Sequence, residues 1–340
     1  MRQIAIPRSL FLSTVVALIL PSLASAQASP DSEKVPRTAY GHPDLSGVWA
    51  NNSATPLERP DELADKATFT PEELATMREA AQRLFGGADD AAFGDGVFQA
   101  ALDNVERNVS GDGGTGNYSS VWMVDRVFEN RTSLITDPPD GKLPPLTRQT
   151  ERQQADQAEQ RRLRPYDGPE NLPLQVRCLT YGIPRVGGIG AGYNSYYQIF
   201  QTPDHIVMLG EMIHDARVIP ISDSPHISDN IRQWHGDARG HWEEDTLVVE
   251  TTNFDARALY RNSGAGRRLV ERLTRIGPDT LHYEITVADP STWTRPWTAL
   301  VPLSQTDDAV YEYACHEGNI GMYGILAGAR VQEAQPTEQP

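Results

Sequence analysis

Strand-like runs separated by turn signals fill the second half of the chain, and they constrain its fold more than any other feature. The alternation of apolar and polar residues is nearly ideal between Leu281 and Ala288. One face would carry Leu281, Tyr283, Ile285 and Val287, and the other His282, Glu284 and Thr286. A period of two indicates a half-buried β-strand with one face toward a core.

Similar runs pair up across short turns, which predicts successive hairpins. Residues 196–201 would meet 205–221, residues 269–276 would meet 281–288, and residues 297–303 would meet 309–317. A meander of long hairpins leaves exposed edges, and closure into a barrel removes them. Gly47-Val48-Trp49 resembles the opening strand of lipocalin-like barrels. We therefore predict a mainly β fold, an antiparallel up-and-down meander closing into a lipocalin-like barrel or strongly curved sheet; a two-sheet sandwich is the alternative.

The expected organisation is a single β-rich domain over residues 43–328 with long loops and a few peripheral helices. Helical insertions are predicted at about 70–85 and 148–164. The first has Thr70 as N-cap, Pro71 at the first helical position and Glu73 to complete a capping box. Residues 329–340 have the composition of a disordered tail.

The N-terminus predicts export. Arg2 and Arg8 precede an apolar run from Leu10 to Leu20, and an A-x-A-like site closes at Ala26. This is the pattern of a cleaved signal peptide over residues 1–26, and its apolar run is too short to span a membrane. A flexible leader over 27–42 would follow. We expect a periplasmic or secreted protein with no membrane insertion.

The net charge of −16 argues against nucleic acid as a partner, because phosphate is bound by Lys/Arg stripes. A small molecule is the expected partner, and the composition says nothing about oligomeric state. The two cysteines, Cys178 and Cys315, predict a disulfide in an oxidising compartment. The alternative is a nucleophilic Cys315 beside His316, although neighbours on a strand point to opposite faces.

Five of the eight histidines lie between Asp204 and Trp242, interleaved with carboxylates and arginines. "EMIHDARVIPI", Glu211 to Ile221, reads as one strand. On it His214 would share the face of Met208 and Met212, which we expect to be the interior, while Asp215 and Arg217 would share the other. Asp237 and Arg239 would lie at a turn. A metal site from His214, His226, His235 or His241 lacks a compelling ligand spacing, so no metal is assigned.

A second polar group follows the last expected strand, where His316, Glu317 and Asn319 come just after Cys315. Catalytic groups favour strand ends and the loops after them. The alternative is a turn anchored by the disulfide.

Several blocks resemble a family of exported bacterial proteins. They are "HPDLSGVW", "RTSLITDPPDGKLPPLT", "EMIHDARVIPI", "GHWEEDTLVVETTNF", "DPSTWTRPWTA" and "YACHEGNIGMYGILAGAR". The resemblance covers most of the chain from His42 to Arg330 and implies a periplasmic or secreted protein, but it carries no activity and no functional residue. His235 and His241 stand where that family's pattern has other residues, which argues against either as a shared catalyst.

The leading hypothesis is an enzyme that acts on a small organic molecule in a barrel pocket by side-chain acid/base chemistry, as a lyase, hydratase or isomerase without a cofactor. His214 and His316 would transfer protons, assisted by Asp215, Asp237 and Glu317. Substrate contacts would come from Arg217, Arg239, Tyr193, Tyr196, Tyr197 and Asn319. One alternative is a lipocalin-like carrier whose pocket is lined by aromatic residues that include Trp49 and Tyr283; another is a metal-dependent hydrolase.

Overall fold

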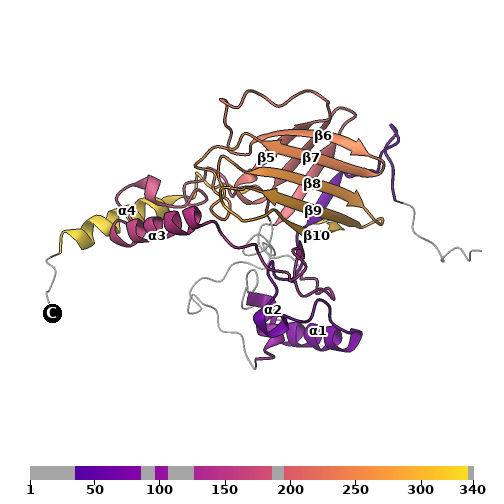
Figure 1. Cartoon of the computed structure of the whole chain (residues 1–340), viewed down its shortest axis with the longest axis horizontal. Helices are drawn as coiled ribbons and strands as arrows, with labels where there is room; N and C mark the ends of the chain where they lie inside the picture. Colours follow the sequence, from indigo (N-terminus) through magenta and orange to yellow (C-terminus); the bar gives the residue numbers. More distant parts are fainter. Residues whose placement is uncertain (1–34, 86–95, 106–125, 186–194, 336–340) are drawn as a thin grey trace, which may run out of the picture. The chain divides into compact units, whose positions relative to one another are not determined.

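The computed structural model describes residues 35–85, 96–105, 126–185 and 195–335. The expected signal peptide and the first half of the expected leader lie outside these ranges, as does Tyr193. Within them the fold is mainly β, with a sheet that is nearly closed into a barrel and peripheral helices (Figure 1).

Nine strands follow one another around the sheet, and each hydrogen-bonded pair along that path is antiparallel. They are β1 (Gly47–Ala50), β3 (Tyr196–Gln201), β4 (His205–Gly210), β5 (Ala216–Pro220), β6 (Asp237–Glu243), β7 (Thr246–Thr252), β8 (Arg268–Arg275), β9 (Thr280–Ala288) and β10 (Trp297–Thr306). The short strand β2 (Ile135–Asp137) pairs with β10 off this path. The spatial order is β5-β4-β3-β1-β10-β9-β8-β7-β6. Apart from the gap between β5 and β6, neighbours around the sheet therefore follow chain order, with β10 beside β1.

The gap between β5 and β6, which we call the seam, has a topological cause. Eight reversals of direction along nine strands leave β5 and β6 parallel, so the last pair cannot be a hairpin. A single parallel bridge joins Ile221 to Gly240, and the Ser222 N–H donates to the Gly240 carbonyl at 3.0 Å. A Cβ at Gly240 would lie 2.8 Å from the Ile221 side chain, so glycine permits this approach. The barrel therefore closes at one point and stays open elsewhere along the seam.

The interior is filled by the inward faces of the strands. Leu281, Tyr283, Ile285 and Val287 of β9 are each at most 2% exposed, which confirms the face predicted from their alternation. Trp49 of β1 is 0% exposed, and its indole N–H donates to the Leu45 carbonyl at 2.9 Å. Each such side chain contributes roughly 1.5–3 kcal/mol when buried.

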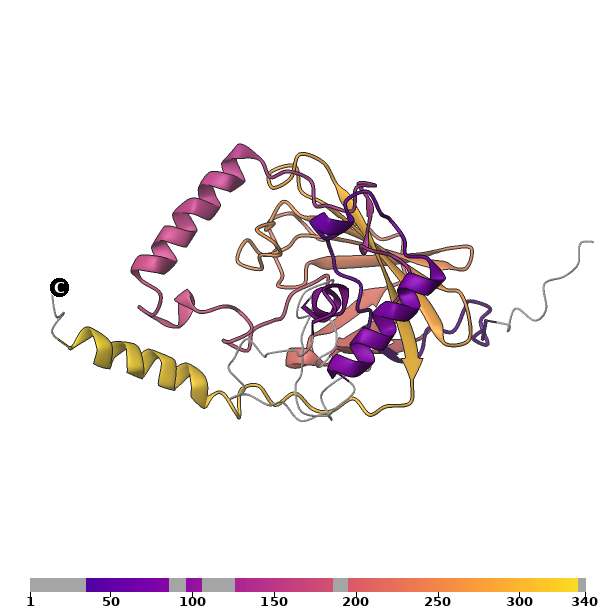
Figure 2. The same ribbon diagram turned by 90° about the horizontal axis from the view of Figure 1, so that it is seen from below.

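Helices α1 (Pro71–Phe85) and α3 (Arg148–Leu163) stand where the sequence predicted them, and they can be followed in Figure 2. The Thr70 and Glu73 side chains form the predicted capping box at α1. Helix α2 (Gly96–Leu102) packs on α1 through an apolar cluster that includes Met77 and Phe98. The remaining long helix is α4 (Ile320–Glu333), and the 3-10 turns are η1 (Asp61–Leu63), η3 (Pro169–Asn171) and η5 (Met212–His214).

Two predicted strands are wrong. Residues 205–221 form β4, the turn η5 and β5 rather than one strand, because Ile213 and His214 adopt left-handed φ values of 60° and 46°. Residues 309–317 contain no strand, and β10 pairs with β9, β1 and β2 instead. Residues 329–333 belong to α4, so the expected tail begins too early.

Candidate functional site

A pocket of about 610 Å³ opens at the seam. Residues 216–218 and Pro220 of β5 form one wall, and residues 237–239 of β6 form the other. Leu179 and residues 232–236, which lead into β6, complete the lining. We call this the seam pocket. Its volume is in the range that holds small ligands, roughly 300–1,000 Å³.

His235 lies in the wall of the seam pocket and is held by two partners. Its Nε2 lies 2.8 Å from the Thr180 Oγ1 and 3.3 Å from an Asp215 carboxylate oxygen. The Asp215 side chain is 7% exposed and the His235 side chain 21%. A buried carboxylate thus holds a half-buried imidazole in the wall of the pocket.

The hydrogen bonds of Thr180 determine which nitrogen of His235 carries the proton. The hydroxyl has one hydrogen, and it is donated to Asp215 Oδ2 at 3.0 Å. The Thr180 Oγ1 also accepts the Gly182 N–H at 2.8 Å. Because its only hydrogen goes to Asp215, Thr180 Oγ1 acts only as an acceptor toward His235. A carboxylate such as that of Asp215 likewise only accepts hydrogen bonds. His235 Nε2 must therefore be N–H, which leaves the lone pair of Nδ1 on the neutral ring, without a partner among the described residues.

The backbone around His235 is fixed by its neighbours. Gly236 has a φ of +70°, and a Cβ there would lie 2.4 Å from the Thr252 carbonyl oxygen, so only glycine fits. The Gln233 N–H donates to the Asn253 carbonyl at 3.0 Å, and the Asp255 N–H donates to the Gln233 carbonyl at 2.8 Å. These contacts tie the segment before β6 to the end of β7.

Arg217 crosses from the seam into the barrel interior. It donates to both carboxylate oxygens of Glu271 at 2.8 and 2.6 Å, and Glu271 also accepts the Tyr283 hydroxyl. Burial alone would lower the pKa of Arg217, but the charge of Glu271 outweighs it and raises that pKa. The Arg217 Nε–H is buried without a partner among the described residues. This ion pair fixes β5 against β8.

Asp237 ties the connector between β5 and β6 to the pocket wall. Its carboxylate accepts from His226 Nδ1 at 2.8 Å, from the Ile227 N–H at 3.1 Å and from Arg239 at 2.8 Å. Burial alone would raise the pKa of Asp237, but these hydrogen bonds and the Arg239 charge lower it. The carboxylate stays ionised and orients Arg239 along the pocket.

The predicted site residues fall into two groups. Arg217, Asp237 and Arg239 line the seam pocket, and Asp215 holds its histidine. His214 is exposed, so its predicted interior position is wrong, and the interior face belongs to Arg217. His316 and Glu317 are exposed as well, and neither side chain forms a hydrogen bond or ion pair within the described ranges. None of these three exposed residues lines the pocket.

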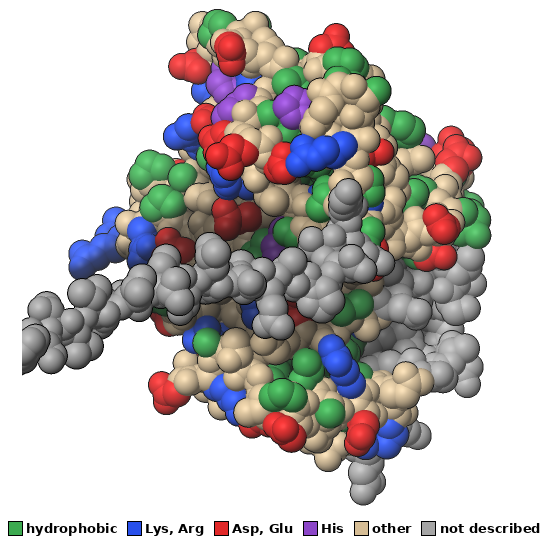
Figure 3. Space-filling model, turned by 90° about the vertical axis from the view of Figure 1, so that its right-hand side faces the viewer, with side chains coloured by type: hydrophobic (Ala, Val, Ile, Leu, Met, Phe, Trp, Pro, Cys, Tyr) green, Lys and Arg blue, Asp and Glu red, His purple; other side chains and the backbone are tan. Residues whose placement is uncertain are grey.

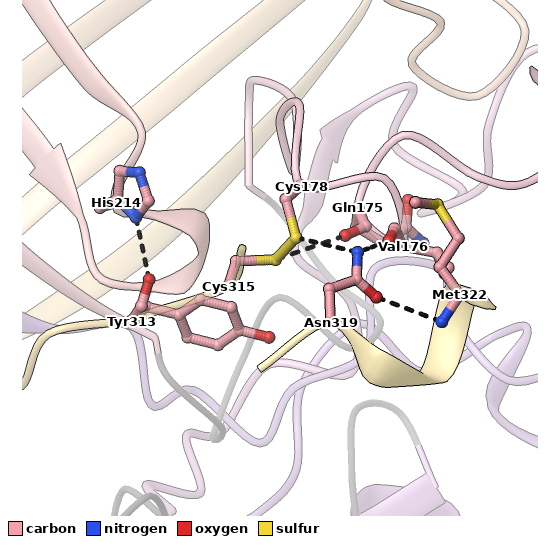
Figure 4. Close-up of a disulfide and its surroundings, with 8 residues drawn as sticks. All are labelled: Gln175, Val176, Cys178, His214, Tyr313, Cys315, Asn319 and Met322. Carbon is pink, nitrogen blue, oxygen red and sulfur yellow. Dashed lines mark hydrogen bonds between the residues drawn. A yellow bond between two sulfur atoms is a disulfide. The ribbon is translucent and has the colours of Figure 1, made fainter. Parts of the chain in front are cut away.

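The group around the disulfide is structural in its contacts (Figure 4). Cys178 and Cys315 form the predicted disulfide. Asn319 caps α4 by accepting the Met322 N–H at 3.3 Å and donates to the Val176 carbonyl at 2.8 Å, so its amide is occupied. His214 Nδ1–H donates to the Tyr313 carbonyl at 2.9 Å, which joins η5 to the segment before the disulfide.

The barrel interior has little room beside the aromatic residues of the predicted carrier pocket. Tyr197 and Tyr283 border a cavity of about 10 Å³, enough for roughly one water molecule. Burial raises the pKa of Tyr197 to about 12, so its phenol stays neutral. Tyr196 donates its hydroxyl to Asp308 at 2.9 Å. An aromatic ligand does not fit beside Tyr197 and Tyr283.

Sequence reasoning considered His235 only as a possible metal ligand and did not consider Thr180 at all. The sequence feature that could have indicated a role for His235 is its position just before Gly236 and the strand that starts at Asp237. No sequence feature pointed to Thr180, because it lies 55 residues from His235 along the chain. In the ranges that the structure describes, no three His, Cys, Asp or Glu side chains form a metal-binding group.

Charged side chains of both signs are interspersed with histidine on the face shown in Figure 3.

Comparisons of the chain with protein-family models, with curated proteins and with solved structures give no match. None of the helices within the described ranges is long and apolar enough to cross a membrane. The disulfide is typical of an oxidising compartment.

Proposed function

We propose that the protein is an enzyme that acts on a small organic molecule by side-chain acid/base chemistry in the seam pocket, with His235 as the general base. The observation that carries the proposal is the hydrogen-bond arrangement of Thr180, which leaves His235 Nδ1 with a free lone pair. A base oriented by a buried carboxylate on the wall of a pocket is the arrangement that proton transfer requires.

Each neighbour has a defined role in this proposal. His235 Nδ1 removes a proton from a carbon of the substrate, and the electron pair of the broken C–H bond stays on the substrate. Asp215 stabilises the imidazolium that forms, because its negative charge lies 3.3 Å from Nε2. Thr180 is a positioning residue. The imidazolium then returns the proton to another carbon, which is an isomerisation, or to a leaving group, which is an elimination.

The proposal includes export. The N-terminal signal-peptide pattern and the Cys178–Cys315 disulfide both support an oxidising, extracytoplasmic compartment. Export is tested by locating the protein after cell fractionation, together with the N-terminal residue of the mature chain. An N-terminus at Gln27 agrees with the proposal, and an uncleaved chain in the cytoplasm contradicts it.

Hydrogen–deuterium exchange at carbon tests the chemistry before the reaction is known. The purified protein is incubated in D₂O with a panel of small ketones, esters and carboxylic acids, and loss of C–H signals is followed by proton NMR. A general base contributes about 10²- to 10⁴-fold, so His235→Gln is expected to slow exchange at least about 100-fold.

His241→Gln is the matched control, because His241 lies on β6, is half-exposed and does not line the pocket. It is expected to exchange at the wild-type rate. Equal rates for the wild type and His235→Gln, or no exchange with any member of the panel, contradict the proposal.

A further inference from the structure

Among the charged side chains of the seam-pocket wall, the groups that keep free hydrogen-bonding capacity are donors. The carboxylates are already occupied: Asp215 accepts from Thr180, the Tyr181 N–H and His235. Asp237 likewise accepts three hydrogen bonds, and Glu271 accepts three in the barrel interior. A ligand in the pocket therefore finds these carboxylates already hydrogen-bonded.

Two guanidinium groups retain free donors there. Arg232 is exposed, and its one hydrogen bond within the described ranges is a 3.3 Å contact to the Ala265 carbonyl. Arg239 uses Nη1 for Asp237, and its Nη2 makes a long 3.4 Å contact to the Pro225 carbonyl. Its Nε has no partner in the described part of the chain. These donors lie on either side of His235 in the sequence and line the same pocket.

The charges also differ between the two. Arg239 is neutralised by Asp237 at 2.8 Å, and Arg217 by Glu271. Arg232 has no ion-pair partner among the described residues, while the carboxylate of Asp215 is held by hydrogen bonds from Thr180, Tyr181 and His235. The Arg232 guanidinium is therefore the cation available to one negative charge on a ligand, whereas a dianion brings a second negative charge toward Asp215 and Asp237 in a chain that already carries −16.

Part of the remaining lining is apolar. Leu179, Val218 and Trp234 contribute apolar surface to a volume of about 610 Å³. Such a pocket suits a ligand with one anionic group and an apolar or aromatic body.

We infer that the seam pocket binds a small monocarboxylate with an apolar body, whose carboxylate oxygens accept from Arg232 and Arg239. The acidic carbon next to the carboxylate then lies at His235 Nδ1. This placement of the acidic carbon rests on the proposed function, but the carboxylate contact does not require turnover.

Binding of phenylacetate and phenylacetamide tests the inference, because the two probes share a shape and differ in charge. Binding is measured by calorimetry and by the NMR shift of the Trp234 indole N–H. A charge-assisted hydrogen bond is worth roughly 10- to 100-fold in affinity. Phenylacetate is expected to bind at least about tenfold more tightly than the amide, with a shift at Trp234.

Arg232→Gln is expected to remove that preference, because it removes the guanidinium that pairs with the carboxylate. Arg232 is exposed, so the variant is expected to fold as the wild type does. Arg268→Gln is the matched control, since Arg268 is an exposed arginine paired with Glu250 on the outward face of β8. It is expected to bind as the wild type does. Phenylphosphonate, a dianion, is expected to bind more weakly than phenylacetate.

Equal affinities for the acid and the amide, no binding of either, a preference that survives Arg232→Gln, or tighter binding of phenylphosphonate overturns the inference. His235→Gln separates this inference from the proposed function. If this variant binds phenylacetate within about threefold of the wild type while neither protein exchanges any carbon acid, the carboxylate site stands and the catalytic proposal falls.

Discussion

Replacing Arg217 with methionine is expected to lower the free energy of unfolding by about 3–5 kcal/mol, the usual cost of leaving a buried charge unpaired. The Glu271 side chain is 0% exposed and the Arg217 side chain 7%. Arg217 supplies two hydrogen bonds to that carboxylate, and Tyr283 supplies a third. Two charge-assisted bonds at roughly 1.5–3 kcal/mol each give a loss of the same size.

The double variant Arg217→Met/Glu271→Met is expected to be more stable than Arg217→Met alone. It removes both charges, so no buried ion is left without a partner, although the Tyr283 hydroxyl loses its acceptor. The assay is urea unfolding at neutral pH with the disulfide intact, analysed by linear extrapolation. The difference between the single and double variants measures the cost of the unpaired carboxylate.

Arg268→Met is the matched control, because Arg268 pairs with Glu250 at a solvent-exposed position on the same strand as Glu271. It is expected to cost about 1 kcal/mol or less. If Arg217→Met costs no more than Arg268→Met, or if the double variant is the least stable of the set, the buried ion pair does not join β5 to β8 as described.

Three further predictions concern the disulfide and the residues that hold the walls of the seam pocket in place. The variant Cys178→Ser/Cys315→Ser, which opens a loop with a sequence separation of 137 residues, is expected to lose about 5 kcal/mol of unfolding free energy; an unchanged urea midpoint contradicts this. Gly236→Ala is expected to cost about 1–3 kcal/mol, since it combines a positive φ with a close contact to a carbonyl, and an unchanged thermal midpoint contradicts it. The folded-state pKa of Asp237 is lowered below its ordinary value of 3.8, so its stabilisation is present above that pH and is lost as the pH falls through the folded pKa. Asp237→Asn is expected to show a shallower fall of stability with pH in that acid range, and identical slopes contradict the assignment.

The barrel could be predicted from the sequence because its signal is local. The alternation from Leu281 to Val287 reports burial directly, and the turns between β3 and β4 and between β8 and β9 lie where turn residues are concentrated. The break at Ile213 and His214 could not be predicted in this way. Both residues adopt left-handed φ without glycine, so nothing in "EMIHDARVIPI" marks the end of a strand.

Only part of the candidate site could be predicted from the sequence, because its hydrogen-bond partners are distant along the chain. Asp215 and Arg217 were recognised as ionisable residues of a strand-like segment, whereas Asp237 and Arg239 were expected at a turn and in fact lie on β6. The partners of Asp215 and Arg217 are distant in sequence: Glu271 lies 54 residues after Arg217, and Thr180 lies 35 residues before Asp215. His235 was set aside because the resemblance places other residues there, whereas in this chain its ring borders the pocket.

The protonation of the His235 ring tests the central claim most directly. Nitrogen-15 NMR correlates the two ring nitrogens with the ring protons and distinguishes the tautomers of a neutral imidazole. The hydrogen bonds of Thr180 and Asp215 predict that Nε2 carries the proton and that Nδ1 is the unprotonated, basic nitrogen. A neutral ring protonated on Nδ1 would contradict the account, because the lone pair would then face Thr180 and Asp215 and no base would be presented to the seam pocket.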